Sequence, residues 1–386
     1  MLLLARLTAA LIFTFGAGQI GAAGLDELPA DTQKLYAKNI LDPVQPVGES
    51  AYRNWKPKKG PPWTIGYASS YAGNTWRAGV MDRLQNELVP KWKKLGLVKE
   101  VIVTQSNLKD ATQIQQIRQL VDQGVDAIIL CCSNPTALNQ SVKYAYDKGV
   151  PVFSSVGYLT SPYAVNSSTN FERAGSEMAE WMAEEISKKG NVLIVQGIPG
   201  TGTSDSLDRG IKKKLAAYPG IKIVGDVAGM WTDQVAQSEV QKWLATNPGQ
   251  LDGIIVQSAS ELGVLRALQQ SGRKMIPITI GENIGALCYW KNNPKFVSAS
   301  FVAWPPGDDF ELSWNIMMRT LQGQGPKLQS VLVAPKKLTH ADVVKALPNC
   351  SESSDKFLNI GIAQWGGKDN LDQFFLRPAD PEKFKK

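Results

Sequence analysis

The feature that most limits the fold is an alternation of short apolar runs with amphipathic stretches, which begins at Trp63. The apolar runs show no internal polar alternation, which is typical of strands that are covered on both faces of a sheet. They predict strands at 63–69, 101–104, 126–131, 150–154, 191–196, 221–227, 252–257 and 276–280.

The stretches between these runs have the spacing of amphipathic helices. Val80, Leu84, Leu88 and Trp92 recur at every fourth position and predict one buried helix face within 75–95. Further helices are predicted over 110–123, after Asn134–Pro135, and over 171–189, 205–217, 233–245 and 260–271. Strands that alternate with such helices predict right-handed βαβ units in a parallel sheet. Because the series restarts and holds too many strands for one small sheet, it predicts two doubly wound α/β lobes.

The N-terminus has the composition of a targeting segment. Residues 1–23 carry one cation, Arg6, then an apolar stretch and a zone of Gly and Ala, which predicts a secretory signal peptide. A membrane anchor is the alternative for this segment. Residues 24–62 are polar and rich in proline, and we expect them to form an extension on the surface.

Charge and residue counts exclude several classes of function. The net charge of +7 comes without a basic stripe, so no nucleic-acid partner is expected. The chain has one histidine, His340, and four cysteines without CxxC spacing, so neither a metal site nor a cofactor is expected. Export permits disulfides, and Cys288 and Cys350 are a candidate pair, whereas the adjacent Cys131 and Cys132 are interpreted as buried thiols.

Candidate ligand residues follow the predicted strands, because ligands of such sheets bind at the carboxyl ends of the strands. These segments contain Trp76, Arg209, Trp231 and Asn283. Indole rings can stack on the C–H faces of a sugar, while amide and guanidinium groups bond its hydroxyls. The combination favours a polyhydroxylated ligand.

Several stretches together resemble periplasmic solute-binding proteins of the ribose-binding type, which serve ABC importers. The resemblance covers about residues 63–335 and rests on TIGYASSYAGNTW (64–76), QLVDQGVDAIIL (119–130), GVPVF (149–153), IVQGIPGTGTSDSLDRG (194–210), ELGVLRALQQSG (261–272) and TIGEN (279–283).

This resemblance implies a periplasmic monomer with two parallel-sheet lobes, joined by a multi-strand hinge, that close on a ligand and are then recognised by an ABC permease of the inner membrane. The implied division is 1–23 signal peptide, 24–62 extension, 63–168 with 304–332 as the N-terminal lobe, and 169–303 with 333–386 as the C-terminal lobe and tail.

The resemblance also assigns ligand contacts to residues that match the family's motifs, namely Asn74, Trp76, Arg209, Trp231, Gln257 and Asn283. Glu282 is a further candidate for a hydroxyl or a cationic group, with the alternative that it is an acid in the first turn of a helix. Asn74 could instead close a turn. Gln257 and Asn283 could instead cap the next helix.

One departure from the family bears on the ligand. Val156–Gly157 stand where the family usually has an Asp-Arg pair that holds sugar hydroxyls. We therefore expect a sugar or polyol other than ribose, with a non-sugar ligand such as an acidic metabolite, or delivery to a sensory receptor, as alternatives. The loop 197–205 lacks both common phosphate-binding motifs, and the chain has no G-x-S-x-G elbow, so neither a nucleotide ligand nor enzyme activity is expected.

Overall fold

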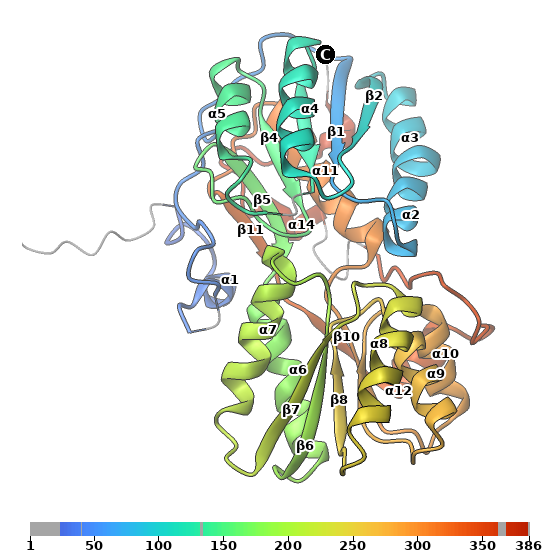
Figure 1. Ribbon diagram of the computed structural model, residues 1–386. Coiled ribbons are helices and arrows are strands. Elements are labelled where there is room, and N and C mark those ends of the chain that lie inside the picture. Colours follow the sequence, from blue (N-terminus) through green and yellow to red (C-terminus); the bar gives the residue numbers. More distant parts are fainter. Residues whose placement is uncertain (1–23, 40, 132–133, 362–367, 385–386) are drawn as a thin grey trace, which may run out of the picture.

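The computed structural model describes residues 24–39, 41–131, 134–361 and 368–384. The predicted signal peptide therefore lies outside the described residues, as does Cys132. The described chain forms two lobes, each built on a six-stranded sheet (Figure 1). No helix among the described residues is long and apolar enough to cross a membrane.

The first lobe contains a fully parallel sheet in the order β11-β5-β4-β3-β1-β2. Its strands are β1 (Trp63–Ser69), β2 (Val98–Gln105), β3 (Ala127–Leu130), β4 (Val152–Ser155), β5 (Ala164–Thr169) and β11 (Ser330–Val333). Its helices are α2 (Thr75–Asp82), which continues through a π-helical stretch (Arg83–Leu88) into α3 (Val89–Lys94), then α4 (Asp110–Asp122), α5 (Asn139–Asp147) and α11 (Pro306–Leu321).

The second lobe contains a sheet in the order β12-β10-β9-β8-β6-β7, in which only the pairing of β12 is antiparallel. Its strands are β6 (Gly190–Gln196), β7 (Ile221–Ala228), β8 (Gly253–Val256), β9 (Ile278–Ile280), β10 (Ser298–Val302) and β12 (Lys336–Leu338). Its helices are α6 (Phe171–Glu185), α7 (Gly202–Leu215), α8 (Asp233–Thr246), α9 (Glu261–Ser271), α10 (Ile284–Asn292) and α12 (His340–Ala346).

Each predicted strand and helix is present, which confirms two doubly wound parallel lobes. Strand β5 was not predicted, because its sequence, AVNSST, is mostly small and polar, yet every residue in it is buried. Asn166 accounts for this, since its Oδ1 accepts from Ser154 Oγ at 2.8 Å and from the Leu159 N–H at 2.9 Å. Satisfied hydrogen bonds make the burial of such a strand tolerable.

Besides the C-terminal tail described below, three segments cross between the lobes, from β5 to α6, from β10 to α11 and from β11 to β12. The crossing segments bond to one another. Thr169 Oγ1 donates to the Ala303 carbonyl, and the Asn170 N–H donates to the Val333 carbonyl at 3.1 Å. These three adjacent crossings form the hinge.

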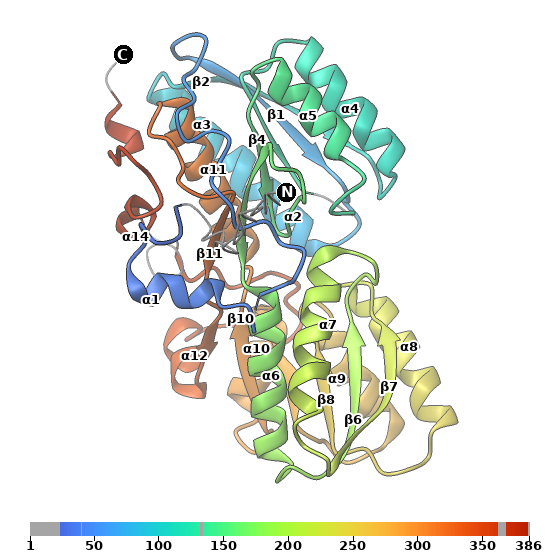
Figure 2. The ribbon, with the colours of Figure 1, turned by 90° about the vertical axis from the view of Figure 1, so that its left-hand side faces the viewer.

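The extension lies against the hinge, where its helix α1 (Ala30–Gln33) is seen beside the junction of the lobes in both ribbon views (Figures 1 and 2). The Tyr36 hydroxyl donates to the Ser330 carbonyl at 2.8 Å in the first lobe. Asn170, in the crossing segment before α6, donates from Nδ2 to the Leu35 carbonyl at 2.8 Å. The extension is therefore bonded to both a lobe and the hinge.

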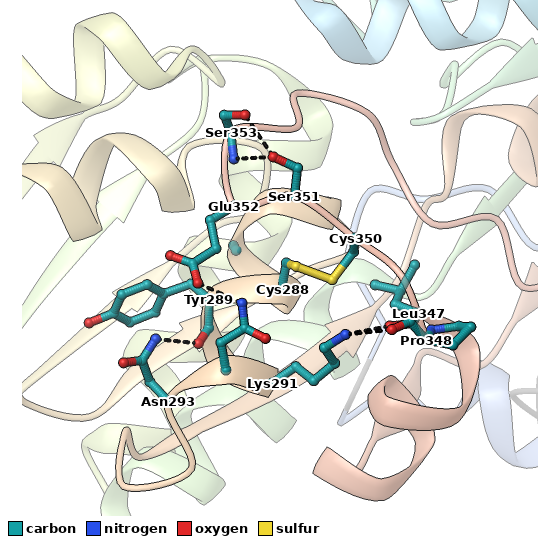
Figure 3. The surroundings of a disulfide bond; sticks show 12 residues. Cys288, Tyr289, Lys291, Asn293, Leu347, Pro348, Cys350, Ser351, Glu352 and Ser353 are labelled. Atoms are coloured by element: carbon teal, nitrogen blue, oxygen red, sulfur yellow. Dashed lines mark hydrogen bonds between the residues drawn. A yellow bond between two sulfur atoms is a disulfide. The ribbon is translucent and has the colours of Figure 1, made fainter.

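The segment after α12 begins in the second lobe, where the candidate disulfide is present between Cys288 of α10 and Cys350 (Figure 3). Lys291 of the same helix donates from Nζ to the Leu347 carbonyl at 2.9 Å and to the Pro348 carbonyl at 3.0 Å (Figure 3). The disulfide thus fixes the start of the tail on the second lobe.

The tail then passes to the first lobe. The Leu358 N–H donates to the Glu282 carbonyl at 2.8 Å in the second lobe, while the Ile360 N–H donates to Asp308 Oδ2 at 2.8 Å in the first. Further on, the Lys327 N–H donates to the Phe374 carbonyl at 2.8 Å. Grouping the whole of 333–386 with the second lobe was therefore too simple, because the described tail packs on the first lobe beyond the hinge.

Candidate functional site

A cavity lies between the lobes, at the carboxyl ends of strands from both sheets. It is lined by Ser70, Tyr71, Asn74, Trp76, Arg77, Leu108, Cys131, Val156, Ile198, Thr201, Thr203, Trp231, Ala259 and Trp304. Each of them lies in or just beyond a loop that follows a strand, and the loop that contains Trp304, after β10, is also the second crossing segment. The cavity therefore occupies the position in which ligands of such sheets bind.

Tryptophan side chains from both lobes and the hinge form much of the wall. Trp76 is only 4% exposed, and its Nε1 donates to the Trp304 carbonyl at 2.8 Å. The Nε1 of Trp231 donates to the Gln257 carbonyl at 2.9 Å. Because the protein already satisfies both indole N–H groups, these two rings offer their carbon surfaces to a ligand.

Gly197 is needed for the position of the Trp231 ring. A Cβ atom at residue 197 would lie 2.1 Å from Trp231 Cε2, a distance that no side chain could keep. Any larger residue would therefore displace the ring from the cavity wall.

The lining carries unusual backbone strain. Leu108, Val156, Trp231 and Ala259 all have φ between 51° and 61°, a left-handed conformation that costs non-glycine residues energy. Strain of this kind persists only where the surrounding structure enforces it, and it concentrates at ligand sites and active sites. The strained residues here come from four separate loops, which supports a functional role for the cavity.

Asn74 serves the helix and the cavity at once. Its Oδ1 accepts from the Arg77 N–H at 2.9 Å and caps the N-terminus of α2. Its Nδ2 donates across the cavity to the Trp231 carbonyl at 3.3 Å. Asn74 therefore links the two lobes directly.

Arg77 is a lining residue that the sequence analysis did not identify. Its guanidinium carbon lies 4.9 Å from the centre of the Trp76 ring, and its Nη2 donates to Cys131 Sγ at 2.7 Å. The sequence feature that could have identified Arg77 is its position directly after Trp76, at the start of a helix that faces the cleft. Trp304 was missed because the predicted series of strands ended before the segment that contains it.

Arg209 does not reach the cavity. It forms ion pairs with Asp42 of the extension and with Glu172 of α6, the latter at 3.4 Å between Nε and Oε2. Asp42 also accepts from Ser206 Oγ at 2.6 Å and from the Tyr158 hydroxyl. The two carboxylates, each almost fully buried, hold the Arg209 side chain away from the cavity lining.

Gln257 is fully buried beneath the cavity loops. Its Oε1 accepts from the Gly197 N–H at 2.9 Å and from Ser204 Oγ at 2.8 Å. Together with its carbonyl, which accepts from Trp231, these bonds make Gln257 a support for two loops that line the cavity, and its side chain is not part of the lining.

Glu282 and Asn283 also lie outside the lining. Asn283 Oδ1 accepts from the Ala286 N–H at 3.0 Å, so Asn283 caps α10. A helix cap was the alternative to ligand contact that the sequence analysis gave for this residue. Glu282 is fully buried, and neither of its carboxylate oxygens has a hydrogen-bond partner among the described residues. Burial raises the pKa of Glu282 well above its usual range, and the neighbouring Glu261 raises it further.

Of the seven predicted site residues, the structure therefore brings Asn74, Trp76 and Trp231 together at one cavity. It places Arg209, Gln257, Glu282 and Asn283 elsewhere. Within the described part of the chain, no cluster of His, Cys, Asp or Glu side chains could hold a metal ion.

Comparison with known proteins agrees with this architecture. A xylitol-binding protein of Mycolicibacterium smegmatis is 28% identical over 264 residues, which cover 67% of this chain and 74% of that protein. The galactofuranose-binding protein YtfQ of Escherichia coli is 24% identical over 55% of this chain and 68% of its own. An ABC transporter solute-binding protein from Thermobispora bispora superimposes with a TM-score of 0.68 at 26% identity, over 76% of this chain and 90% of that one.

Residues 65–325 match the family described as periplasmic binding protein domain. This match spans more than half of the 386 residues. The chain therefore belongs to the periplasmic binding protein domain family.

Proposed function

We propose that this protein is an exported solute-binding protein that captures a sugar or polyol between its lobes and delivers it to the permease of an ABC importer. The observation that carries the proposal is the interlobe cavity, whose walls combine Trp76 and Trp231 from opposite lobes with hydroxyl and amide groups. The xylitol-binding and galactofuranose-binding relatives support the choice of a polyhydroxylated ligand.

The cavity offers matching groups for the two surfaces of such a ligand. Apolar C–H faces would lie against the indole rings, as sugars do in aromatic-lined pockets. Ligand hydroxyls would bond the side chains of Ser70, Thr201 and Thr203 at the cavity surface. A ligand without a matching hydroxyl would leave a buried polar group unpaired, at a cost of about 1–3 kcal/mol for each group.

Ligand capture would proceed by closure about the three crossing segments. A ligand that contacts both walls stabilises the closed form and shifts the population toward it. The hydrogen bond between Asn74 and the Trp231 carbonyl forms only when the lobes are together. The closed lobes would then present one continuous surface to the permease, and no covalent step is involved.

Export to the periplasm is supported by two features. The signal-like composition of residues 1–23 would direct secretion. The Cys288–Cys350 disulfide is stable in an oxidising compartment such as the periplasm.

Mass spectrometry of small molecules released from the purified, denatured protein tests this function, together with a thermal-shift screen of sugars, polyols, amino acids and nucleosides. We expect a five- or six-carbon sugar or polyol skeleton in the released fraction and stabilisation by the same class. Stabilisation by an amino acid or a nucleoside alone would contradict the proposal.

A further inference from the structure

The cavity contains one charged side chain among its described lining residues, and that side chain is Arg77. We infer that the ligand is an anionic sugar derivative, a sugar acid whose carboxylate meets the Arg77 guanidinium. This inference rests on the proposed function, because it assumes that the cavity takes a polyhydroxylated ligand.

The described surroundings of Arg77 leave its positive charge without an ion-pair partner. Its polar neighbours are the Cys131 thiol, at 2.7 Å from Nη2, and the Tyr67 hydroxyl. A thiol is a weak acceptor, and the guanidinium has five N–H donors in a planar fork. No Asp or Glu among the described residues forms an ion pair with Arg77, although Arg209 has two such partners.

Among the described residues, Asp309 of α11 carries a carboxyl group that interacts electrostatically with Arg77. It is fully buried, does not line the cavity, and accepts from Ser155 Oγ at 2.8 Å. Burial raises the pKa of Asp309 to about 7, an effect that Ser155 and Arg77 oppose. At neutral pH Asp309 is therefore only partly ionised, so it balances the charge of Arg77 incompletely.

A ligand carboxylate would supply the missing charge. Arginine binds carboxylates through two parallel N–H···O bonds, and these charge-assisted bonds are shorter and stronger than bonds to hydroxyls. Closure removes water from around Arg77, which makes an unpaired cation costly and a paired one favourable. A neutral polyol could offer only hydroxyl lone pairs at the same place.

The rest of the cavity fits the hydroxylated body of such an acid. The Arg77 guanidinium carbon lies over the Trp76 ring, 4.9 Å from its centre, and the part of that ring which lines the cavity would contact the carbon chain or ring of the ligand. Thr201 and Thr203 line the opposite wall, from the second lobe. The carboxylate is thus expected on the first lobe, with the hydroxyls between the lobes.

Titration calorimetry with matched ligand pairs tests the inference. The panel contains five- and six-carbon aldonates and uronates, each beside the alditol or aldose of the same configuration, with the corresponding sugar phosphates as a separate arm. At neutral pH and low salt we expect the best acid to bind at least about tenfold more tightly than its neutral partner, since bonds to charged groups are stronger by about that factor.

The Arg77→Gln variant should remove this preference. It should lose about tenfold or more in affinity for the acid and clearly less for the neutral partner, because a bond from Arg77 to a hydroxyl is weaker than one to a carboxylate. Arg118→Gln, on the exposed surface of α4 in the same lobe, is the matched control and should bind like the wild type. Melting of the unliganded Arg77→Gln protein checks that it folds.

The outcomes separate the two proposals. Neutral sugars or polyols that bind as tightly as the acids, or an equal loss of both in Arg77→Gln, would overturn the inference and leave the proposed function standing. Tighter binding of a sugar phosphate would overturn the assignment to a carboxylate. Failure of every panel member to bind would overturn the proposed function itself.

Discussion

Two arginines, Arg209 and Arg77, have contrasting surroundings. Arg209, which is not part of the cavity lining, is held by Asp42 and Glu172, both almost fully buried. Arg77, on the cleft side, faces the cavity with a thiol and a phenol as its described polar neighbours. The resemblance to the ribose-binding type assigned ligand contact to Arg209, whereas the structure gives Arg77 the position from which a ligand can be reached.

The difference shows how a segment outside the family core can change the role of a core residue. Asp42 belongs to the extension, which precedes the matched region, and it lies where Arg209, Ser206 and Tyr158 can all bond it. Since Tyr158 is in the first lobe and Arg209 in the second, Asp42 ties both lobes to the extension. Arg209 thus has its charge balanced within the protein.

Trp231→Ala should give the largest change on the cleft side. Loss of a central aromatic contact typically costs about 2–4 kcal/mol of binding free energy, so we expect a loss in affinity of roughly 30-fold to 1,000-fold. Calorimetric titration with the tightest sugar, polyol or sugar acid measures it. Trp55→Ala, in the extension and outside the cavity lining, is the control. Equal affinities of the two variants would show that Trp231 is not a ligand wall.

Asp309→Asn should change how stability depends on pH. The raised pKa of about 7 means that the folded protein holds a proton which the unfolded chain, with the ordinary value, has released. This group therefore makes the folded state less stable as pH rises from about 4 to 7, by up to about 4 kcal/mol. Denaturant unfolding at pH 5 and at pH 8 should show a smaller loss of stability in the variant. An unchanged difference between the two pH values would mean that Asp309 is not protonated in the folded state.

Arg209→Ala should affect stability and leave binding almost unchanged. The substitution leaves the buried carboxylates of Asp42 and Glu172 with fewer partners, and because Arg209 itself is partly exposed we expect a loss of about 1–2 kcal/mol. Lys212→Ala, on the same helix but with more exposed partners, should cost less than about 1 kcal/mol. A large loss of ligand affinity in Arg209→Ala would reverse the comparison between the two arginines.

Asn74→Ser should have the smallest effect. Serine keeps the cap on α2 but cannot donate to the Trp231 carbonyl, so only the bond between the lobes is lost. We expect affinity to fall by about threefold to tenfold, as for one hydrogen bond, with little change in melting temperature. Asn74→Ala, which loses both functions, should in addition lower the melting temperature.

Sequence patterns predicted strands β1 to β4 and β6 to β9 but missed β5, β10, β11 and β12, although β11 is as apolar as several of the predicted strands. For strand β5 there is a physical reason, because the burial of its polar residues depends on Asn166, which bonds Ser154, 12 residues away, and Ser330, 164 residues away. Helix α11 was also missed. All of its residues except Glu311 are buried, and the predicted series of elements ended at 276–280, before this helix begins.

The position of the candidate site could be predicted from the sequence, but only some of its residues could. The ends of parallel strands indicate where a ligand binds, and Asn74, Trp76 and Trp231 follow from that rule. The rule does not say which neighbouring side chain points inward. Gln257 and Asn283 follow strands as well, but they bond backbone N–H groups of adjacent loops and helices instead.

A crystal structure of the protein with its tightest-binding sugar, polyol or sugar acid is the most direct test of capture between the lobes. We predict one ligand molecule between Trp76 and Trp231, in contact with both lobes and with an oxygen bonded to Arg77. A ligand bound to one lobe alone, or at a surface away from these three side chains, would contradict the mechanism.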